Sequence, residues 1–386
     1  MKILQVSKLY FPWIGGVEKA VQDIAEGLNG KDNFEIEVLV CQPRGCGKIE
    51  EINGVKVTKA GSLGMFWGMP ISFSFLSLFK KLSKEADIID FHYPFPLGDL
   101  ALFLFRPKAK LIVHYHSDIV RQKIFNFLTK PFVNHTLKKS QKIIVSNPNL
   151  IKSSPYLQKF EEKCEVVPFG VDFKEIENNL NEKEVGKIKE RYGNFVLFVG
   201  RLNYYKGTKY LIEAMKDVRA NLVIIGEGPE LANYKLQITN YKLEDRTYFL
   251  PHLSEKELIN FYRACSVFVL PSIFRSEAFG IVLIEAMACG APVISTELGT
   301  GTSWVNVNNK TGFVVLPRDS LALAQAIKKI LGNKKMAQGF SQNALKKARK
   351  EFSLEGMLKK TEKAYKNLFL RYKNSAKKFI NTLVRI

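Results

Sequence analysis

The stretch from Val267 to Gly290 constrains the fold more than any other part of this sequence. Four apolar residues, Val267–Leu270, are followed by a turn rich in Pro, Ser and Gly, and then by a second apolar run, Ile281–Ala288. The first run has the length of a buried strand, and the second predicts a buried helix that ends at Gly290. A strand, a turn and a helix in this order indicate an α/β fold.

The start of this predicted helix has the chemistry of an anion site. A helix N-terminus exposes unpaired N–H groups and the positive end of its dipole, so Phe279, Gly280 and Ile281 are expected to receive a phosphate. Two carboxylates flank this point, Glu277 in the turn and Glu285 on the helix. Because carboxylates repel an anion, we expect them to accept hydrogen bonds from hydroxyls attached to it. A sugar carries such hydroxyls.

The second predicted α/β unit also places two cations at the carboxyl edge of its sheet. A strand that begins at Phe195 ends in Gly200 and Arg201, and Lys206 comes shortly before the next helix. Arginine offers a fork for phosphate oxygens and lysine a compact charge, so the pair predicts a phosphate clamp; a helix-capping salt bridge is the alternative. The glycines of residues 226–229 lack the third glycine of a dinucleotide fingerprint, which argues against an NAD site.

Two features of the first half are candidates for the same site. Gly15 and Gly16 precede a predicted helix over residues 17–28, where they either form a plain turn or let the backbone approach a ligand. His116 follows a predicted strand over residues 111–115. Ligands of open α/β sheets collect at the carboxyl ends of strands, which favours a functional His116 over a structural one.

Composition limits the partners of the chain. The 386 residues suit two domains, and a net charge of +21 indicates an anionic partner. Nine Lys or Arg but one acid, Glu362, fall within residues 356–386. An anionic membrane and nucleic acid are both candidates for this basic tail, and a solvated helix is the third reading. The five cysteines show no paired spacing, and we expect a reducing cytoplasm.

The pattern PS-x4-E-x-FG-x4-EA around Glu277 and Glu285 resembles the E-x7-E motif of retaining glycosyltransferases of family 4. The resemblance extends over essentially the whole chain. It implies that Glu277 holds the donor sugar and Glu285 the ribose of the nucleotide. It further implies that Arg201 and Lys206 clamp the diphosphate and that His116 lies near the transferred sugar. Gly15 and Gly16 match the family's glycine pair, which faces donor and acceptor.

The resemblance also implies an architecture, the GT-B fold of two facing Rossmann-like domains with parallel sheets. We expect an acceptor-binding domain over residues 1–172, a linker over 173–192 and a nucleotide-sugar domain over 193–355. Residues 356–386 are expected to form a basic helix that crosses back to the first domain.

The predicted activity is transfer of a hexosyl unit with retention of configuration. The chain contains no D-x-D triplet, so we expect neither a metal nor another cofactor, with the cations in place of the metal. Nothing in the sequence supplies an obvious carboxylate nucleophile, which favours front-face attack. The alternatives are a sugar-nucleotide epimerase or phosphorylase on the same fold, and a nucleic-acid-binding protein that uses the basic tail.

The stretches 115–122 and 299–303 resemble those of transferases that build lipopolysaccharide O-chains, often mannosyl- or rhamnosyltransferases. The resemblance suggests GDP-mannose as donor, then a UDP-hexose, with a glycan or lipid-linked acceptor. The uncharged residues 64–79, followed by Lys80, Lys81 and Lys84, predict a core helix after a loop, or an apolar lip that touches lipid. We therefore expect a cytoplasmic enzyme held peripherally at the inner membrane face, without nucleic acid as a partner.

Overall fold

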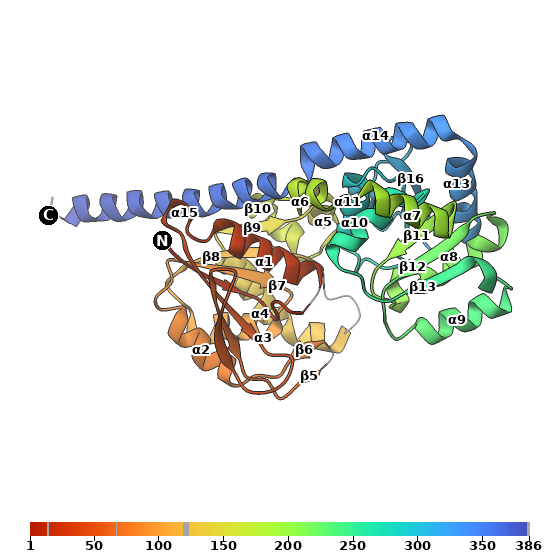
Figure 1. The fold of residues 1–386 in the computed structure, drawn as a ribbon. Coiled ribbons are helices and arrows are strands. Elements are labelled where there is room, and N and C mark those ends of the chain that lie inside the picture. Colours follow the sequence, from red (N-terminus) through yellow and green to blue (C-terminus); the bar gives the residue numbers. More distant parts are fainter. Residues whose placement is uncertain (14, 67, 119–122, 384–386) are drawn as a thin grey trace. The chain divides into compact units, whose positions relative to one another are not determined.

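The computed structural model describes residues 1–13, 15–66, 68–118 and 123–383, the side chains of 123–127 and 370–383 excepted. The chain forms two compact units. Unit 1 contains Met1–Ser146, Ser154–Val167 and Gly356–Ile386, and unit 2 contains Asn147–Ser153 and Pro168–Glu355. Each unit is built on a largely parallel sheet covered by helices, which confirms the predicted α/β class (Figure 1).

The sheet of unit 1 has the strand order β10-β9-β8-β7-β1-β2-β4-β3. All neighbours are parallel except β3 and β4, which form an antiparallel edge. The strands are β1 (Lys2–Val6), β2 (Glu35–Cys41), β3 (Lys48–Ile52), β4 (Val55–Ala60), β7 (Ile88–Tyr93), β8 (Lys110–Tyr115), β9 (Lys142–Val145) and β10 (Cys164–Val166). The central strands β1, β7 and β8 are almost fully buried, as is typical of a parallel sheet with helices on both faces.

Five longer helices belong to unit 1: α1 (Gly16–Leu28), α2 (Ser74–Leu82), α3 (Pro96–Phe105), α4 (Lys123–Lys139) and α15 (Leu354–Leu383). The last of them, α15, lies in unit 1 from Gly356 onward and packs against α1. An ideal Cβ on Gly27 of α1 would lie 2.5 Å from a methyl carbon of Leu358, so only glycine permits this approach. The predicted return of the final helix to the first domain is thereby confirmed.

Unit 2 has an entirely parallel sheet in the order β13-β12-β11-β14-β15-β16. Its strands are β11 (Phe195–Val199), β12 (Asn221–Ile225), β13 (Thr247–Leu250), β14 (Val267–Leu270), β15 (Val293–Thr296) and β16 (Gly312–Val315). The flanking helices include α8 (Thr208–Ala214), α9 (Leu231–Asn240), α10 (Glu255–Ala264), α11 (Ile281–Ala288), α13 (Ser320–Gly332) and α14 (Lys334–Glu351). Strands β11 and β14 are neighbours although β12 and β13 lie between them in the sequence, and this brings their following loops together.

The two units do not follow the boundaries expected from the sequence. Residues 173–192, expected as a linker, form α6 (Phe173–Asn179) and α7 (Glu182–Tyr192), whose Tyr192 ring contacts Phe261 of α10. The backbone N–H of Asn181, between the two helices, donates to the Asn260 side chain. A short helix within residues 1–172, α5 (Pro148–Ser153), also belongs to unit 2. An aromatic contact and an amide hydrogen bond to α10 make residues 173–192 part of unit 2. The sequence carries only a weak signal for such contacts, so these boundaries were not predicted.

The uncharged segment after β4 is not one long helix. It begins with a small hairpin of β5 (Met65–Phe66) and β6 (Met69–Pro70), and helix α2 starts only at Ser74. Within the described residues, no helix combines the length and the hydropathy needed to cross a membrane. This agrees with reading residues 64–79 as a loop and a helix rather than as a span.

Candidate active site

The predicted strand, turn and helix around Glu277 are present as β14 and α11. Gly280 precedes α11 with a φ of 83°, a left-handed conformation that favours glycine. An ideal Cβ there would lie 3.0 Å from methyl carbons of Leu270 and Leu283, tighter than ordinary packing. Gly280 therefore fixes the turn that leads into the helix. The first N–H groups of α11, which have no intrahelical acceptor, begin at this residue.

Phe279 contributes only its backbone to this turn. Its side chain is 2% exposed and sits in an aromatic cluster with Phe169, Trp304 and Phe352. The ring anchors the turn to the core of unit 2. A phosphate at this helix start would therefore meet the N–H of residue 279 and not its side chain.

Glu277 is bound to Lys206 in the turn before α11. The Nζ of Lys206 donates to Oε2 of Glu277 at 2.6 Å, and both side chains are about nine-tenths buried, 12% and 10% exposed. Lys206 ends the short helix η3 (Tyr204–Lys206) after β11, whereas Glu277 follows β14. Two residues assigned to the diphosphate and to the sugar are thus partners of each other.

The ion pair has a clear electrostatic signature. Burial alone would lower the pKa of Lys206, but the Glu277 carboxylate outweighs burial and raises it. Lys206 thus stays charged in the folded protein. A buried pair of this kind contributes little net stability, yet removing one partner leaves an unpaired buried charge.

Other groups hold the Glu277 segment in place. The Ser272 hydroxyl donates to the same Oε2 at 3.0 Å, and the Thr300 hydroxyl donates to the backbone carbonyl of Glu277 at 2.7 Å. The N–H of Gly301 donates to Ala278 O at 2.8 Å. Two residues of the loop 299–303 thus hold the backbone of the Glu277 turn.

Glu285 is fixed by a residue that sequence reasoning missed. The buried Tyr262 hydroxyl donates to Glu285 Oε2 at 2.8 Å from helix α10. Burial and the neighbouring carboxylate raise the Tyr262 pKa well above its ordinary value, so this hydroxyl remains a donor. Glu285 lies one helical turn inside α11 and is partly buried. No motif links residue 262 to residue 285, and only the packing of α10 on α11 reveals the contact.

Arg201 lies on the exposed loop after β11. The glycines that looked like part of a dinucleotide fingerprint pack against this loop. An ideal Cβ on Gly226 would lie 2.3 Å from Gly200 O, and one on Gly228 would lie 2.4 Å from Leu202 O. These glycines therefore let the β12 loop approach the Arg201 loop.

His116 lies in unit 1, directly after β8, and is 6% exposed. Its Nε2 is 2.9 Å from Nδ1 of His92. Burial, and then the neighbouring histidines, lower the His116 pKa well below its ordinary value, so the ring is neutral at pH 7. Asp118 nearby accepts from Tyr115 and from Ser154, both at 2.6 Å. Residues 119–122, the end of the stretch 115–122 noted in the sequence, lie outside the described residues.

Gly15 and Gly16 begin α1 in unit 1. Gly15 has extended backbone geometry, and an ideal Cβ there would lie 2.3 Å from a carboxylate oxygen of Glu18. Glu18 is 6% exposed, with Lys8 Nζ 3.9 Å from its carboxylate. A carboxylate at this helix start disfavours a phosphate there, and it suits a hydroxyl ligand better.

Known proteins resemble this chain over most of its length. Residues 14–175 match the family model described as "Glycosyltransferase Family 4", and residues 180–347 match that of "Glycosyl transferases group 1". The O-antigen chain mannosyltransferase C of Escherichia coli is 32% identical over 96% of this chain and 98% of its own. The D-rhamnosyltransferase WbpZ of Pseudomonas aeruginosa is 31% identical over 92% of each.

Solved structures share the fold at lower identity. Sucrose-phosphate synthase from Thermosynechococcus elongatus has a TM-score of 0.80 at 22% identity, covering 96% of this chain and 99% of that one. Anabaena HepE in complex with UDP-glucose has a TM-score of 0.77 at 20% identity, covering 95% and 100%. The fold is GT-B, and the class of protein is a glycosyltransferase. The chain belongs to glycosyltransferase family 4.

Proposed function

We propose that this enzyme transfers a hexosyl unit, mannosyl in the first instance, from a nucleotide-diphosphate sugar to a glycan or lipid-linked acceptor during O-antigen assembly. Two relatives that align over nearly their whole length carry the names of an O-antigen chain mannosyltransferase and a D-rhamnosyltransferase. GDP-mannose is the first donor candidate and a UDP-hexose the second. Transfer occurs with retention of anomeric configuration and without a metal.

The buried pair Lys206–Glu277 beside the start of α11 carries this proposal. Lys206 holds one oxygen of the Glu277 carboxylate, and the other oxygen accepts hydrogen bonds from hydroxyls of the donor sugar. Glu285, held by Tyr262, accepts from the ribose hydroxyls. The backbone N–H groups at Gly280 and Ile281 bind the diphosphate. The carboxylates thus accept from neutral hydroxyls, and the N–H groups donate to the anionic diphosphate.

In this reaction the positive groups stabilise the departing diphosphate. Because Glu277 neutralises much of the Lys206 charge, the exposed Arg201 is the main cation for the phosphates, and the α11 N-terminus adds to it. A preorganised donor aimed at developing charge is worth about 3 kcal/mol of barrier. The acceptor hydroxyl attacks from the side of the leaving group and gives its proton to the departing phosphate oxygen. The neutral His116 lies near the transferred sugar in this account.

A lipid-linked acceptor requires an enzyme that works at a membrane, and unit 1 has two features suited to this. Large apolar side chains are exposed around the β5–β6 hairpin, with Leu63 71%, Phe66 57% and Phe73 77% exposed. A cavity of about 580 Å³ is lined by five cations, Lys80, Lys84, Arg106, Lys108 and Lys110. We propose that these features and the basic tail hold the enzyme peripherally to an anionic, inner membrane face.

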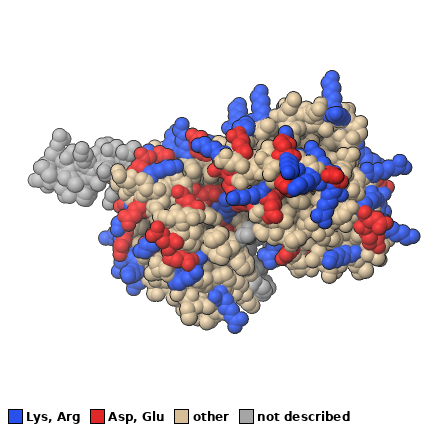
Figure 2. All heavy atoms as spheres, in the orientation of Figure 1, with Lys and Arg blue, Asp and Glu red and all other residues tan. Residues whose placement is uncertain are grey.

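A nucleic-acid partner is less well supported. On the face shown in Figure 2, Lys and Arg are scattered over both units and interspersed with Asp and Glu, rather than gathered in one stripe. Nucleic-acid-binding proteins concentrate positive charge along the path of the phosphate backbone. The charge on this face therefore agrees better with a diffuse anionic surface.

A panel of nucleotide sugars screened by thermal shift tests the donor. We expect GDP-mannose to raise the melting temperature most, with a smaller rise for GDP alone and none for free mannose. The variant Glu285→Ala should lose most of the shift for every donor that binds. Equal shifts for all nucleotides, or none for any, would remove the nucleotide-sugar site from unit 2.

A further inference from the structure

A buried polar cluster lies on one face of the sheet of unit 1 and reaches His116. It includes a carboxylate, an amide, a phenol and three imidazoles, which come from β1, β7, β8, the loop after β8 and helix α15. The members are Gln5, Asp90, His92, His114, His116 and Tyr365, and each is at most 6% exposed.

Strand pairing brings these side chains together. Gln5 of β1 is paired with Asp90 of β7, and His92 of β7 is paired with His114 of β8. Because side chains alternate along a strand, Asp90 and His92 share a face, as do His114 and His116. The cluster is therefore a consequence of register and does not depend on a flexible loop.

Asp90 carries the charge of the cluster. Burial alone would raise its pKa, but His114 and His92, together with the Tyr365 hydroxyl, outweigh burial and lower it. The Tyr365 hydroxyl donates to Oδ2 from α15. Burial lowers the pKa of His114 to about 4, so that ring is neutral at pH 7. An ionised carboxylate only accepts hydrogen bonds, so the groups around Asp90 must present protons to it.

This requirement decides the proton position on His92. Its Nε2 lies 3.6 Å from Asp90 Oδ2 and 3.0 Å from the position assigned to the amide nitrogen of Gln5. A lone pair on Nε2 would face the anion, whereas a proton there is attracted by it. A half-turn of the Gln5 amide brings its oxygen to the same position, and this oxygen otherwise has no hydrogen-bond partner among the described residues. Both neighbours thus favour Nε2–H on His92.

The other ring nitrogen of His92, Nδ1, then determines the proton position on His116. A ring whose single proton sits on Nε2 has a lone pair on Nδ1, and Nδ1 of His92 lies 2.9 Å from His116 Nε2. His116 must donate in this contact, so its own proton sits on Nε2. We propose that Asp90, Gln5 and His92 are positioning residues that fix His116 as the Nε2–H tautomer, with an acceptor lone pair on Nδ1.

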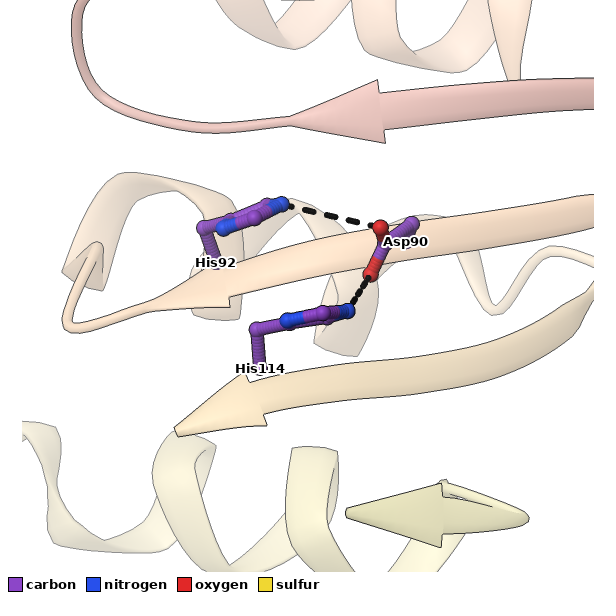
Figure 3. Close-up of side chains that lie close together, drawn as sticks. All are labelled: Asp90, His92 and His114. Atoms are coloured by element: carbon purple, nitrogen blue, oxygen red, sulfur yellow. Dashed lines mark ion pairs between the residues drawn. The ribbon is translucent and has the colours of Figure 1, made fainter. Parts of the chain in front are cut away.

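A metal ion is the competing explanation for this cluster. The ligand atoms of Asp90, His92 and His114 lie within 4.8 Å of one another. However, the rings of His92 and His114 are stacked, with centroids 4.6 Å apart and planes 16° from parallel. Figure 3 shows each ring facing a different oxygen of Asp90. Lone pairs of parallel rings do not converge on one ion, whereas a metal requires convergence at about 2.0–2.2 Å.

The chain of contacts from Asp90 through His92, called the relay below, gives His116 a definite chemical role. This role rests on the proposed function, which places His116 near the transferred sugar. A neutral imidazole with a lone pair on Nδ1 accepts a hydrogen bond from a sugar hydroxyl and cannot donate one there. The opposite tautomer would present a proton and reject the same hydroxyl orientation. Helix α15 contributes through Tyr365, which helps to keep Asp90 in place.

Nitrogen-15 spectra of selectively histidine-labelled full-length protein test the tautomer directly. The chain has five histidines, and His135→Gln and His252→Gln remove the two outside the cluster; His116→Ala identifies the His116 signals. We expect neutral Nε2–H forms of both His92 and His116 at pH 7. An Nδ1–H form of His116, a charged ring on His92, or a stoichiometric metal with metal-shifted nitrogens would overturn the proposal.

Substitutions connect the tautomer to turnover. Asp90→Asn should release the Nε2–H preference of His116 and lower kcat at least about tenfold, with little change in the donor KM. Tyr365→Phe keeps the charge and should keep the tautomer, and Asp99→Asn is the control for a buried carboxylate outside the cluster. An unchanged His116 tautomer in Asp90→Asn would contradict the relay. If Asp90→Asn does not fold, or no donor is turned over, the wild-type spectrum alone decides the proposal.

Discussion

Lys206 and Glu277 form a buried ion pair at 2.6 Å between the loops that follow two adjacent strands, β11 and β14. The pair lies at the carboxyl edge of the sheet of unit 2, where ligands of open α/β sheets bind. It ties the lysine proposed to clamp the diphosphate to the carboxylate proposed to bind the donor sugar. The state of one residue therefore depends on the other.

The two residues should be strongly coupled in stability. Lys206→Ala and Glu277→Ala each leave an unpaired charge and should each lower the free energy of unfolding by about 3 kcal/mol, whereas the double variant loses less than their sum. Urea unfolding of the four proteins gives the coupling energy. The exposed pair Lys187–Glu184, also at 2.6 Å, is the matched control and should show about 0.5 kcal/mol or less. Additive effects at the buried pair would show that the two side chains do not interact in solution.

Glu285 is expected to act mainly in donor binding. Glu285→Ala should weaken the donor dissociation constant about tenfold or more because ribose hydroxyls lose their acceptor. Tyr262→Phe removes only the hydroxyl that holds Glu285 and should have a smaller effect in the same direction. Calorimetry with the preferred nucleotide measures both. A donor constant that is unchanged in Glu285→Ala would refute the ribose assignment.

The buried Asp99 makes a specific contribution to the pH dependence of stability. Burial raises its pKa from 3.8 to about 8. A raised carboxyl pKa gives stability that is complete below about pH 4 and is lost as the pH rises through 8. Asp99→Asn removes this term, so the variant should gain stability over the wild type by on the order of 1 kcal/mol per pH unit from pH 5 to pH 8. Urea titrations across this range test the slope, with the exposed Asp245→Asn as control; parallel curves would exclude a neutral Asp99.

Membrane docking predicts co-sedimentation with vesicles that contain anionic lipid. Each engaged Lys or Arg is worth about 1 kcal/mol near such a surface, and salt screens it. Charge reversal at Lys80 and Lys84, which line the basic cavity, should release the protein at moderate salt. The same reversal at Lys183 and Lys187 on helix α7 of unit 2 adds the same charge and should have little effect. Equal binding to neutral vesicles, or no binding to anionic ones, would exclude electrostatic docking. The basic residues would then be only a solvated surface.

Local sequence signals predict many of the strands. An apolar run with clear turns at its ends gives β14 to the residue, and the start of β11 at Phe195 is also as predicted. The edge strand β3 escapes notice because it alternates Ile with Lys and Glu, and the β5–β6 hairpin because it is short and glycine-bordered. Such edge elements obtain their stability from pairing and not from their own composition.

The relationships between site residues are harder to predict because they depend on strand order and helix docking. No local sequence pattern predicts that Lys206 binds Glu277, because the contact requires β11 and β14 to be neighbours. The same holds for Tyr365 and Asp90, which are 275 residues apart. One local signal for the buried cluster was present: His114 and His116 are two residues apart near the end of a strand, so their side chains lie on the same face of the sheet.

A transfer assay tests the central claim most directly. The wild-type enzyme, its preferred nucleotide sugar and a lipid-linked acceptor are combined in the presence of EDTA, and NMR determines the anomeric configuration of the product. We predict full activity in EDTA and the same anomeric configuration in the product as in the donor. Glu277→Gln preserves the size of the side chain while removing its charge, and it should lower the rate by at least about a hundredfold. Inversion at the anomeric carbon, activity restored only by manganese or magnesium, or a near-normal rate for Glu277→Gln would contradict the account.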